Sequence, residues 1–316
     1  MRVERFATNP IVRPNLDARM GDNVNGPSLI RVPDWLPQPL GRYYLYFAHH
    51  DGRFIRLAFA DDLAGPWRIY TPGVLPLADS GFAGHLASPD VHVDEECREI
   101  RLYFHGADDP SAPGPRERPG VLPLPAGGGL AGQHTRVALS PDGLHFTARP
   151  ELLGRPYFRV VRWRRWWLAL GMPGVLSRSR DGLTGFAEGP TLFGPNQRHT
   201  ALLLDGDTLS VFFTNAGDSP ERILVSRIAL KDDWHAWRAS PPELVLEPAT
   251  DYEGAGLPLE PSHRGLVAGP VRQLRDPCIF REGGHVYLLY AVAGESGIAI
   301  AELRAGSGAR RDPPPS

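Results

Sequence analysis

The sequence predicts an all-β protein, a five-bladed β-propeller whose ring is closed by the N-terminal strand. Three observations carry this prediction. Amphipathic helix patterns are almost absent, whereas short β-rich runs occur along the whole chain. One three-strand unit recurs five times in order. The fifth unit is one strand short, and the chain holds a matching strand at its other end.

The recurring unit is a central apolar strand with a strand and a turn before it and a third strand after it. The central strands read YYLYFAHH at 43–50, IRLYFHG at 100–106, WWLALGM at 166–172, LSVFFTN at 209–215 and VYLLYAVAG at 286–294. Such a repeat favours propeller blades over a β-sandwich, because a sandwich gives no reason for the unit to recur in order. The fifth unit ends at Leu303, so RVERF at 2–6 is expected to supply its outer strand and remove the free sheet edges.

The length allows one large β domain or two ordinary ones, and it is enough to bury a core without disulfide bonds or metal ions. Because the repeat runs along the chain as one ring, a single domain is expected over residues 1–305. The last eleven residues, GSGARRDPPPS at 306–316, have the composition of a disordered C-terminal tail. The stretch at 106–129 is rich in glycine and proline and lies between predicted strands. It is expected to form a long surface loop.

Composition excludes several classes of partner. The formal net charge is −2, from 34 basic and 36 acidic residues, which argues against a nucleic-acid or anionic-membrane surface. The N-terminal MRVERFATNPIVRP lacks the apolar core of a signal peptide, and no later run could span a bilayer, so a cytoplasmic protein is expected. Cys97 and Cys278 lack metal-ligand spacing and are expected to be reduced thiols. Nothing in the sequence fixes the oligomeric state.

Polar side chains gather on one face of the predicted ring. In a propeller, the loop into each innermost strand and the loop between the second and third strands lie on the same face. The side chains that these loops supply, and that we expect to bind substrate, are Asn25, His49, His50, His85, His105, Arg159, Arg198, Arg222, Arg275 and Glu295. The opposite face receives mostly turn residues. A purely structural propeller would not need this asymmetry, so a ligand site is expected at this mouth.

Several of these residues have a plainer interpretation. His49 and His50 are as readily loop histidines as ligand contacts, and Arg275 most simply neutralises Asp276. His199 could act as an acid, cap its strand, or coordinate a central calcium ion or a structural water. The spacing of residues demands no metal, and no cofactor is required.

The pattern resembles the five-bladed propeller glycoside hydrolases of families 43 and 117. RDPCIF at 275–280 and SPDVHVD at 88–94 are similar to the innermost-strand starts that carry aspartates in those enzymes, and ADDLAGPW at 60–67 is similar to their hairpin ends. The resemblance covers essentially the whole chain at the level of blades. It implies an inverting mechanism with a general base, a general acid and a third carboxylate that tunes the acid.

The resemblance implies that Asp90 or Asp276 is the base, since both match aspartates at innermost-strand starts. It leaves three candidates for the acid. These are Glu253 in the long connection before the fifth unit, His199, because family 117 resembles the case of a histidine acid, and Glu295.

The chain also departs from the family pattern. Asn25, Tyr157 and His199 stand where an acidic residue is expected in the first, third and fourth blades.

Glycoside cleavage explains why carboxylates are wanted at the mouth. The transition state resembles an oxocarbenium ion, so one group must protonate the departing oxygen while another activates water. The two groups need environments that keep one protonated and the other ionised, and Arg275 would hold Asp276 ionised. The expected activity is inverting, exo-acting hydrolysis of a short oligosaccharide or of a pentosyl or galactosyl end group.

Two other functions fit the same residues. A phosphorylase would use inorganic phosphate, and Arg159, Arg198 and Arg222 could form its anion site. A sugar-binding propeller without catalysis is the second, because acidic residues are missing at three of the expected positions. A sialidase would also need an arginine cluster, but that class prefers six blades.

Overall fold

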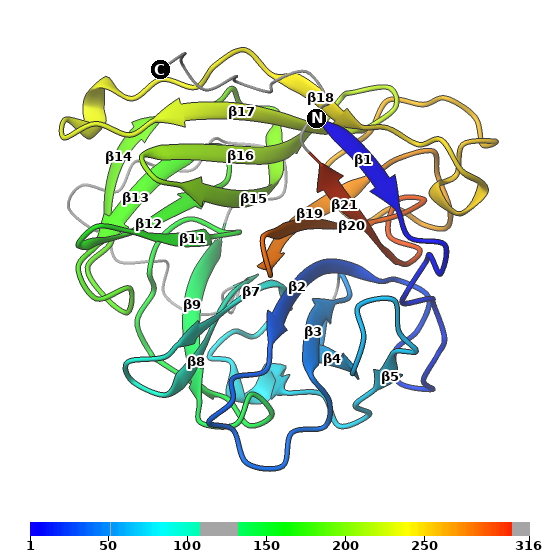
Figure 1. The fold of residues 1–316 in the computed structure, drawn as a ribbon, viewed down its shortest axis with the longest axis horizontal. Helices are drawn as coiled ribbons and strands as arrows, with labels where there is room; N and C mark the ends of the chain where they lie inside the picture. Colours follow the sequence, from blue (N-terminus) through cyan, green and yellow to red (C-terminus); the bar gives the residue numbers. More distant parts are fainter. Residues whose placement is uncertain (51, 108–131, 305–316) are drawn as a thin grey trace, which may run out of the picture.

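The structure is a computed structural model and describes residues 1–50, 52–107 and 132–304. Five antiparallel sheets surround a central axis, which confirms the predicted five-bladed propeller (Figure 1). The predicted tail at 306–316 and most of the predicted loop at 106–129 lie outside the described residues.

Each of the first four blades runs from the axis outward in chain order. Blade one holds β2 (Asn25–Arg31), β3 (Tyr43–Ala48), β4 (Phe54–Ala60), β5 (Arg68–Ile69) and β6 (Leu75–Pro76), of which β6 pairs with β4. Blade two holds β7 (Leu86–Asp94), β8 (Glu99–Ala107), β9 (Gln133–Ser140) and β10 (Thr147–Ala148). Blade three holds β11 (Arg159–Trp163), β12 (Trp166–Gly171), β13 (Val175–Ser179) and β14 (Ala187–Thr191). Blade four holds β15 (Gln197–Asp205), β16 (Thr208–Asn215), β17 (Ile223–Ala229) and β18 (Glu243–Leu246).

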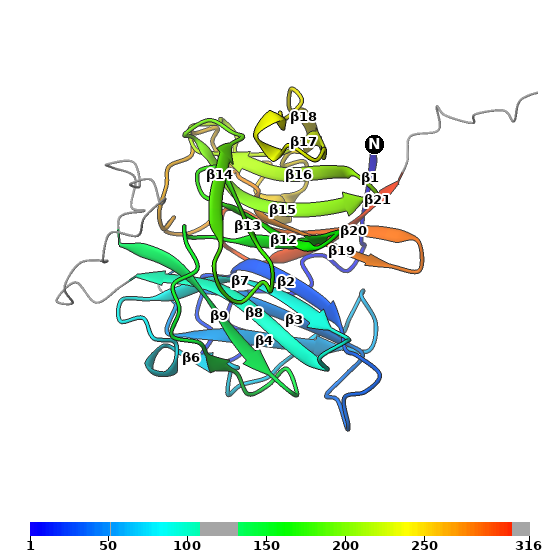
Figure 2. The same cartoon turned by 90° about the vertical axis from the view of Figure 1, so that its left-hand side faces the viewer.

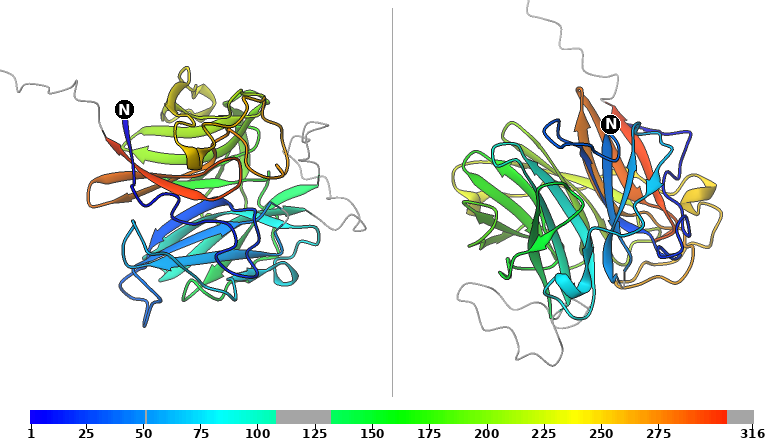
Figure 3. Two further views of the ribbon diagram at one scale, coloured as in Figure 1. Left: turned by 90° about the vertical axis from the view of Figure 1, so that its right-hand side faces the viewer. Right: turned by 90° about the horizontal axis from the view of Figure 1, so that it is seen from below.

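The N-terminal strand completes blade five, as the sequence predicts. The blade holds β19 (Arg275–Glu282), β20 (His285–Ala291), β21 (Ile298–Arg304) and, on its outer edge, β1 (Arg2–Arg5). The antiparallel register of β1 on β21 pairs Val3 with Leu303 and Arg5 with Ala301. Figure 3 shows β1 in blue beside β21 in red, so the first and last described strands pair within one sheet.

Helical structure is confined to three short 3₁₀ turns in the described residues. These are η1 (Leu77–Asp79), η2 (Trp234–Ala236) and η3 (Asp251–Glu253). No helix in the described part of the chain is long and apolar enough to cross a membrane.

The central strand of a blade is buried on both faces, which is why it reads as an unbroken apolar run. In β3, Tyr44 and Tyr46 pack into the core between blades one and two, whereas Leu45 and Phe47 pack into the core between blades one and five. Successive side chains of a strand point to opposite faces of its sheet, so the run serves two interfaces at once. Figure 2 shows the sheets packed face against face.

One apolar cluster fills each of the five interfaces between neighbouring blades. Residues at their centres are Leu102 between blades one and two, Val160 between two and three, Leu170 between three and four, Phe212 between four and five, and Ile300 between five and one. Burial of this apolar surface is the main force that holds the ring together. The innermost strands β2, β7, β11, β15 and β19 are thereby set around the axis, with their starts at one face.

Candidate functional site

The five blades share one unusual backbone position at the start of the innermost strand. It is held by Gly26, Ser88, Tyr157, His199 and Asp276, with φ of 60°, 49°, 64°, 48° and 48°. In every blade except the third, a register shift in the pairing of the innermost strand spans this residue. A positive φ is uncommon for residues other than glycine, and such strain concentrates at functional sites.

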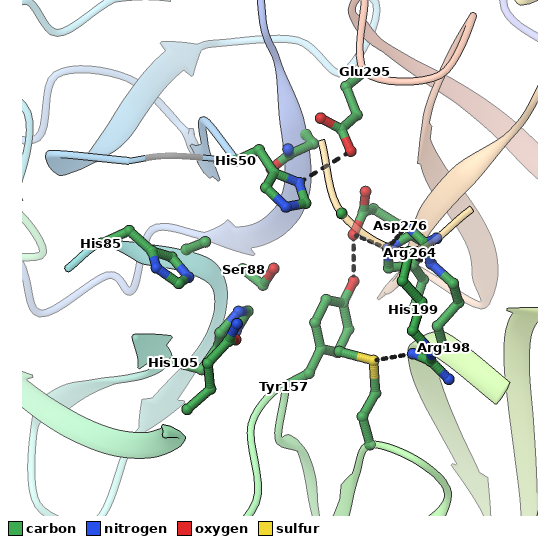
Figure 4. Close-up of a pocket in the computed structure, with 15 residues that line it drawn as sticks. His50, His85, Ser88, His105, Tyr157, Arg198, His199, Arg264, Asp276 and Glu295 are labelled. Carbon is green, nitrogen blue, oxygen red and sulfur yellow. Dashed lines mark hydrogen bonds and ion pairs between the residues drawn. The ribbon is translucent and has the colours of Figure 1, made fainter. Parts of the chain in front are cut away.

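Four of these five side chains line one pocket at the mouth, which has a volume of about 90 Å³ (Figure 4). Gly26 holds the fifth position, and a Cβ there would lie 3.0 Å from the backbone Cα of Ser88, so a side chain would crowd blade two. The shared backbone geometry therefore aims a hydroxyl, a phenol, an imidazole and a carboxylate from four blades into one space.

Asp276 is the central carboxylate of this pocket. It is 3% exposed, and its Oδ1 accepts a hydrogen bond of 2.6 Å from the phenol of Tyr157. Burial, followed by the charge of Asp276, raises the pKa of Tyr157 well above its usual value, so the phenol keeps its proton and donates. Nε2 of His199 lies 3.7 Å from the same oxygen. No described residue hydrogen-bonds Oδ2 of Asp276, so that oxygen can accept from a ligand or a water.

His199 is held neutral and in one orientation. Its Nδ1 lies 3.2 Å from Oγ1 of Thr214 and 3.4 Å from Oε1 of Glu221, and its Nε2 accepts from Nη2 of Arg198 at 2.8 Å. Burial and then the charge of Arg198 lower the pKa of His199. These partners assign the proton to Nδ1 and the lone pair to Nε2.

Glu221 is a fully buried carboxylate beneath the pocket. It lies 3.6 Å from Nε of Arg198 and 3.2 Å from Nε of Arg275. Burial opposes its ionisation, but Arg198, the contact with His199 and Arg275 outweigh burial and hold the pKa of Glu221 well below its usual value. Glu221 is therefore the buried negative charge that balances Arg198 and Arg275 beneath the pocket.

Glu295 anchors the part of the pocket next to blade one. Its Oε1 accepts from Nη1 of Arg275 at 2.9 Å and lies 3.2 Å from Nδ1 of His50, and its Oε2 accepts from Asn23. Burial opposes ionisation, yet His50, Arg275 and Asn23 bring the pKa of Glu295 to about 2. An ionised carboxylate of this kind cannot donate a proton near neutral pH, which removes Glu295 as the general acid. It orients His50 instead.

A wall of histidines lies opposite His199 (Figure 4). The rings of His85 and His105 meet edge to face with centroids 5.9 Å apart, and His105 lies 5.7 Å from the ring of Tyr157. Burial, followed by the charges of His85 and Arg159, lowers the pKa of His105 well below its usual value. His105 is therefore a neutral part of the wall.

Most of the substrate-binding candidates from the sequence do meet at the mouth. Those that line the pocket are Asn25, His50, His85, His105, Arg198 and Glu295, together with the catalytic candidates His199 and Asp276. Arg275 is 1% exposed and lies behind the pocket, where it links Glu221 to Glu295.

Arg159 also lies behind the pocket rather than in its lining. Its guanidinium is 4.2 Å from the ring centroid of Tyr157 and donates to the carbonyls of Ser88 at 3.0 Å and Thr200 at 3.0 Å. It therefore ties the starts of three innermost strands together below Tyr157.

His49 and Arg222 were also expected at the mouth but do not line the pocket. The Arg222 side chain is 42% exposed and lies 4.0 Å from Glu247. The structure therefore does not bring these two residues together with the other substrate-binding candidates.

The position expected for Asp90 is held by Ser88. Asp90 lies two residues beyond Ser88, past the register shift in β7, and lines a second cavity together with Arg159 and Val160. There it accepts hydrogen bonds from the backbone N–H of Val160 at 2.7 Å and from His92 at 2.8 Å. The structure therefore does not bring Asp90 to Asp276, and a role for it as the base is unsupported.

Glu253 is likewise away from the pocket. It is fully buried and accepts from Nε of Arg5 at 2.7 Å, from the phenol of Tyr290 at 2.8 Å and from the backbone N–H of Ala249 at 2.8 Å. These bonds join β1 to blade five and to the connection before it. These are the contacts of a structural carboxylate, and the structure does not bring Glu253 to Asp276.

The pocket residues that the sequence analysis missed include Ser88, Met172 and Arg264. Ser88 had a usable signal, since Gly26, Ser88 and Asp276 all precede a proline. Met172 follows β12 in a loop that was expected at the mouth, but its apolar side chain gave no reason to single it out. Arg264 comes from a long connection whose path the strand pattern does not define. In the described part of the chain, no three His, Cys, Asp or Glu side chains gather as a metal site, near His199 or elsewhere.

Comparison with known proteins gives one relative and many similar folds. The uncharacterized protein R118 of Acanthamoeba polyphaga mimivirus is 34% identical over 338 residues, which cover 95% of this chain and 90% of that protein. No protein-family model matches the chain.

Several solved glycoside hydrolases share the propeller. CoXyl43, a family 43 β-xylosidase/α-arabinofuranosidase from a compost metagenome solved with xylotriose, has a TM-score of 0.59 at 14% identity, with 97% and 96% of the two chains covered. A putative glycoside hydrolase from Parabacteroides distasonis has a TM-score of 0.63 at 11% identity over 95% of each chain. The α-L-arabinofuranosidase of Lactobacillus brevis has a TM-score of 0.57 at 11% identity, over 95% and 93%. At these identities the likeness confirms the fold that the resemblance implied.

Proposed function

The chain belongs to the same family as the mimivirus protein R118, and we propose that it is a glycoside hydrolase that removes a terminal sugar from a short oligosaccharide. The observation that carries the proposal is the geometry of Asp276. Its backbone has a φ of 48°, its Oδ1 accepts a hydrogen bond from Tyr157, and its Oδ2 has no hydrogen-bond donor among the described residues. The shared propeller of family 43 xylosidases and arabinofuranosidases supports the same reaction class.

Asp276 is the base in this proposal. Tyr157 holds Oδ1, which leaves Oδ2 to accept a proton from the water that attacks the anomeric carbon. His199 lies 3.7 Å from Oδ1, too close to act as the opposing acid, since inverting enzymes separate the two groups by about 6.5–9.5 Å. Nε2 of His199 accepts from Arg198 and has no proton to give, which is a second reason why His199 is not the acid.

His50 is the acid in this proposal. The ionised carboxylate of Glu295 accepts from Nδ1 of His50 and so directs Nε2 toward the pocket (Figure 4). A carboxylate behind an imidazole fixes its tautomer and stabilises the imidazolium, which can then protonate the departing oxygen. Acid and base would come from neighbouring blades, one and five.

The small pocket favours exo action. It has room for a single end group rather than for a groove that a polymer could cross. The xylotriose bound by CoXyl43 makes xylosides and arabinosides the first sugars to test.

Two variants test the proposed roles on a panel of alkyl and nitrophenyl glycosides without phosphate. Asp276→Asn should lower kcat at least about 10²-fold on both kinds of substrate. His50→Gln should lower kcat strongly on alkyl glycosides but little on nitrophenyl glycosides, whose leaving group departs without a proton. Turnover that persists in Asp276→Asn would overturn the assignment of the base. An equal loss in His50→Gln on both substrates would overturn that of the acid.

Phosphorolysis is the second candidate, and one observation favours it. Arg264 lines the pocket without a carboxylate partner among the described residues. Release of sugar from these glycosides only when inorganic phosphate is present would support a phosphorylase. Thermal stabilisation by a sugar with no release from any glycoside would support a binding propeller instead.

A further inference from the structure

Arg264 differs from the other arginines of the mouth in its partners. Arg275 and Arg198 each approach a buried carboxylate, at 2.9 Å for Glu295 and 3.6 Å for Glu221. No carboxylate in the described part of the chain lies within ion-pair distance of Arg264. Among the arginines that line the pocket, Arg264 is therefore the one whose charge no carboxylate of the described residues pairs.

The guanidinium of Arg264 is fixed on one side only. Nη2 donates to the carbonyls of Pro195 and Gln197, the latter at 3.3 Å. Among the residues that the structure describes, Nη1 contacts only the thioether of Met172, at 3.7 Å. A thioether is a weak acceptor, so Nη1 keeps its capacity for a strong hydrogen bond on the pocket side.

The backbone beside Arg264 is anchored rather than loose. Ser262 is 2% exposed, its N–H donates to the carbonyl of Asp218 at 3.0 Å, and its carbonyl accepts from Gly217 at 2.9 Å. These two hydrogen bonds of Ser262, two residues before Arg264, fix the connection to blade four. A pinned guanidinium loses little freedom when it binds an anion.

The electrostatic surroundings agree with this geometry. Burial and then the charge of Arg198 lower the pKa of Arg264, and the charge of Glu221 opposes them only in third place. A bound anion would add a negative charge beside Arg264 and so favour its charged form.

We propose that Arg264 forms an oxyanion site of the pocket, which binds a carboxylate or phosphate group of the ligand. The inference rests on the proposed function only in taking the pocket as the sugar site. The group has two sources. It is either a substituent of the sugar, as in a uronic acid, or free inorganic phosphate that acts as the second substrate.

Binding measurements test the site independently of turnover. Calorimetric titrations of wild-type protein and of Asp276→Asn would use inorganic phosphate, glucuronate and galacturonate, with glucose and galactose as uncharged partners. We expect at least one oxyanion to bind, and Arg264→Gln to weaken that binding about tenfold or more, as the loss of a charge-assisted hydrogen bond would. Arg264→Lys should retain part of it.

Arg238→Gln is the matched control, because Arg238 also donates to two backbone carbonyls, those of His235 and Trp237, but lies outside the pocket. It should leave oxyanion binding unchanged. Equal binding of all oxyanions by wild type and Arg264→Gln, or no oxyanion binding by wild type, would overturn the proposal.

The two sources are separated by the activity of the wild-type protein. Tighter binding of a uronic acid than of its uncharged sugar assigns the site to the substrate. Release that requires phosphate and yields a sugar 1-phosphate assigns it to the co-substrate. In that reaction a phosphate oxygen bonds to the anomeric carbon, the glycosidic bond breaks, and the departing oxygen takes a proton. A failure of binding leaves the glycosidase proposal standing, and a failure of turnover leaves the binding result standing.

Discussion

The phenol of Tyr157 donates a hydrogen bond of 2.6 Å to Asp276, although 119 residues separate the two in the chain. Both residues occupy the same strained position of their blades, with φ of 64° and 48°. The bond therefore joins two equivalent points of the ring across its mouth. It also fills one of the two oxygens of the carboxylate on which the proposed chemistry depends.

Removal of this phenol should cost both stability and activity. Tyr157→Phe leaves a buried carboxylate oxygen without its donor, so the free energy of unfolding should fall by about 1–3 kcal/mol. The proposed base should also lose its orientation, and kcat should fall. Urea unfolding and initial rates measure the two effects. Tyr46→Phe, which removes the buried phenol bonded to the carbonyl of Gly143, should reduce stability alone. Unchanged rates in Tyr157→Phe would mean that the bond does not position the base.

Glu295 should make stability depend on acid pH. Its pKa falls from an ordinary 4.5 to about 2 in the folded protein, which corresponds to about 3 kcal/mol at pH 7. Because the folded pKa is depressed, this stability is present above pH 4.5 and is lost as the pH falls toward 2.

The change in unfolding free energy between pH 7 and pH 3 isolates the contribution of Glu295. In Glu295→Gln this change should be about 2 kcal/mol smaller than in the wild type. Glu96→Gln, which removes a carboxylate that is 78% exposed, should leave it as in the wild type. An identical pH dependence in wild type and Glu295→Gln would contradict the depressed pKa.

Glu253 should matter for closure of the ring and not for chemistry. Glu253→Gln weakens the buried contacts with Arg5 and Tyr290, so unfolding should become easier by about 3 kcal/mol. At a temperature where the variant is folded, kcat should stay that of the wild type. A large fall in kcat with intact stability would restore Glu253 as a candidate acid.

Gly26 should be intolerant of any side chain. Gly26→Ala pays for a left-handed φ of 60° and also drives a Cβ to 3.0 Å from the backbone of Ser88. Gly283→Ala has a similar φ of 58°, but its Cβ would meet only His285 at 4.0 Å. Both should lose about 1–2 kcal/mol from the backbone, and Gly26→Ala should lose more. Equal thermal shifts in the two variants would show that the contact with Ser88 is relieved at no cost.

The fold was predictable because its signal is local and repeated. Each central strand packs into two interfaces, so runs such as 43–48 are apolar throughout and stand out from their neighbours. Blade five lacks a fourth strand in the sequence repeat, and residues 2–5 form a strand outside the repeat. Pairing the two closes the ring.

The site was predictable in part, and two causes account for the positions of Asp90 and Arg264. The backbone bulge places the residue before the proline at the mouth, so aligning the aspartates of RDP and SPD shifts blade two by two residues. Asp90 was misplaced for this reason, while Asp276 was found. Arg264 reaches the pocket from a long connection, and no strand periodicity reports where such a segment runs.

Pairing of Arg2 with Arg304 means that the first and last described strands are neighbours in one sheet. A closed ring has no first blade, so the order in which the chain visits the blades carries no chemical meaning. Joining the two ends through a short linker and opening the chain between β14 and β15 would give a circular permutant with the same strand pairs. Comparisons between such propellers must therefore allow rotation about the axis, since equivalent mouth residues can occupy differently numbered blades.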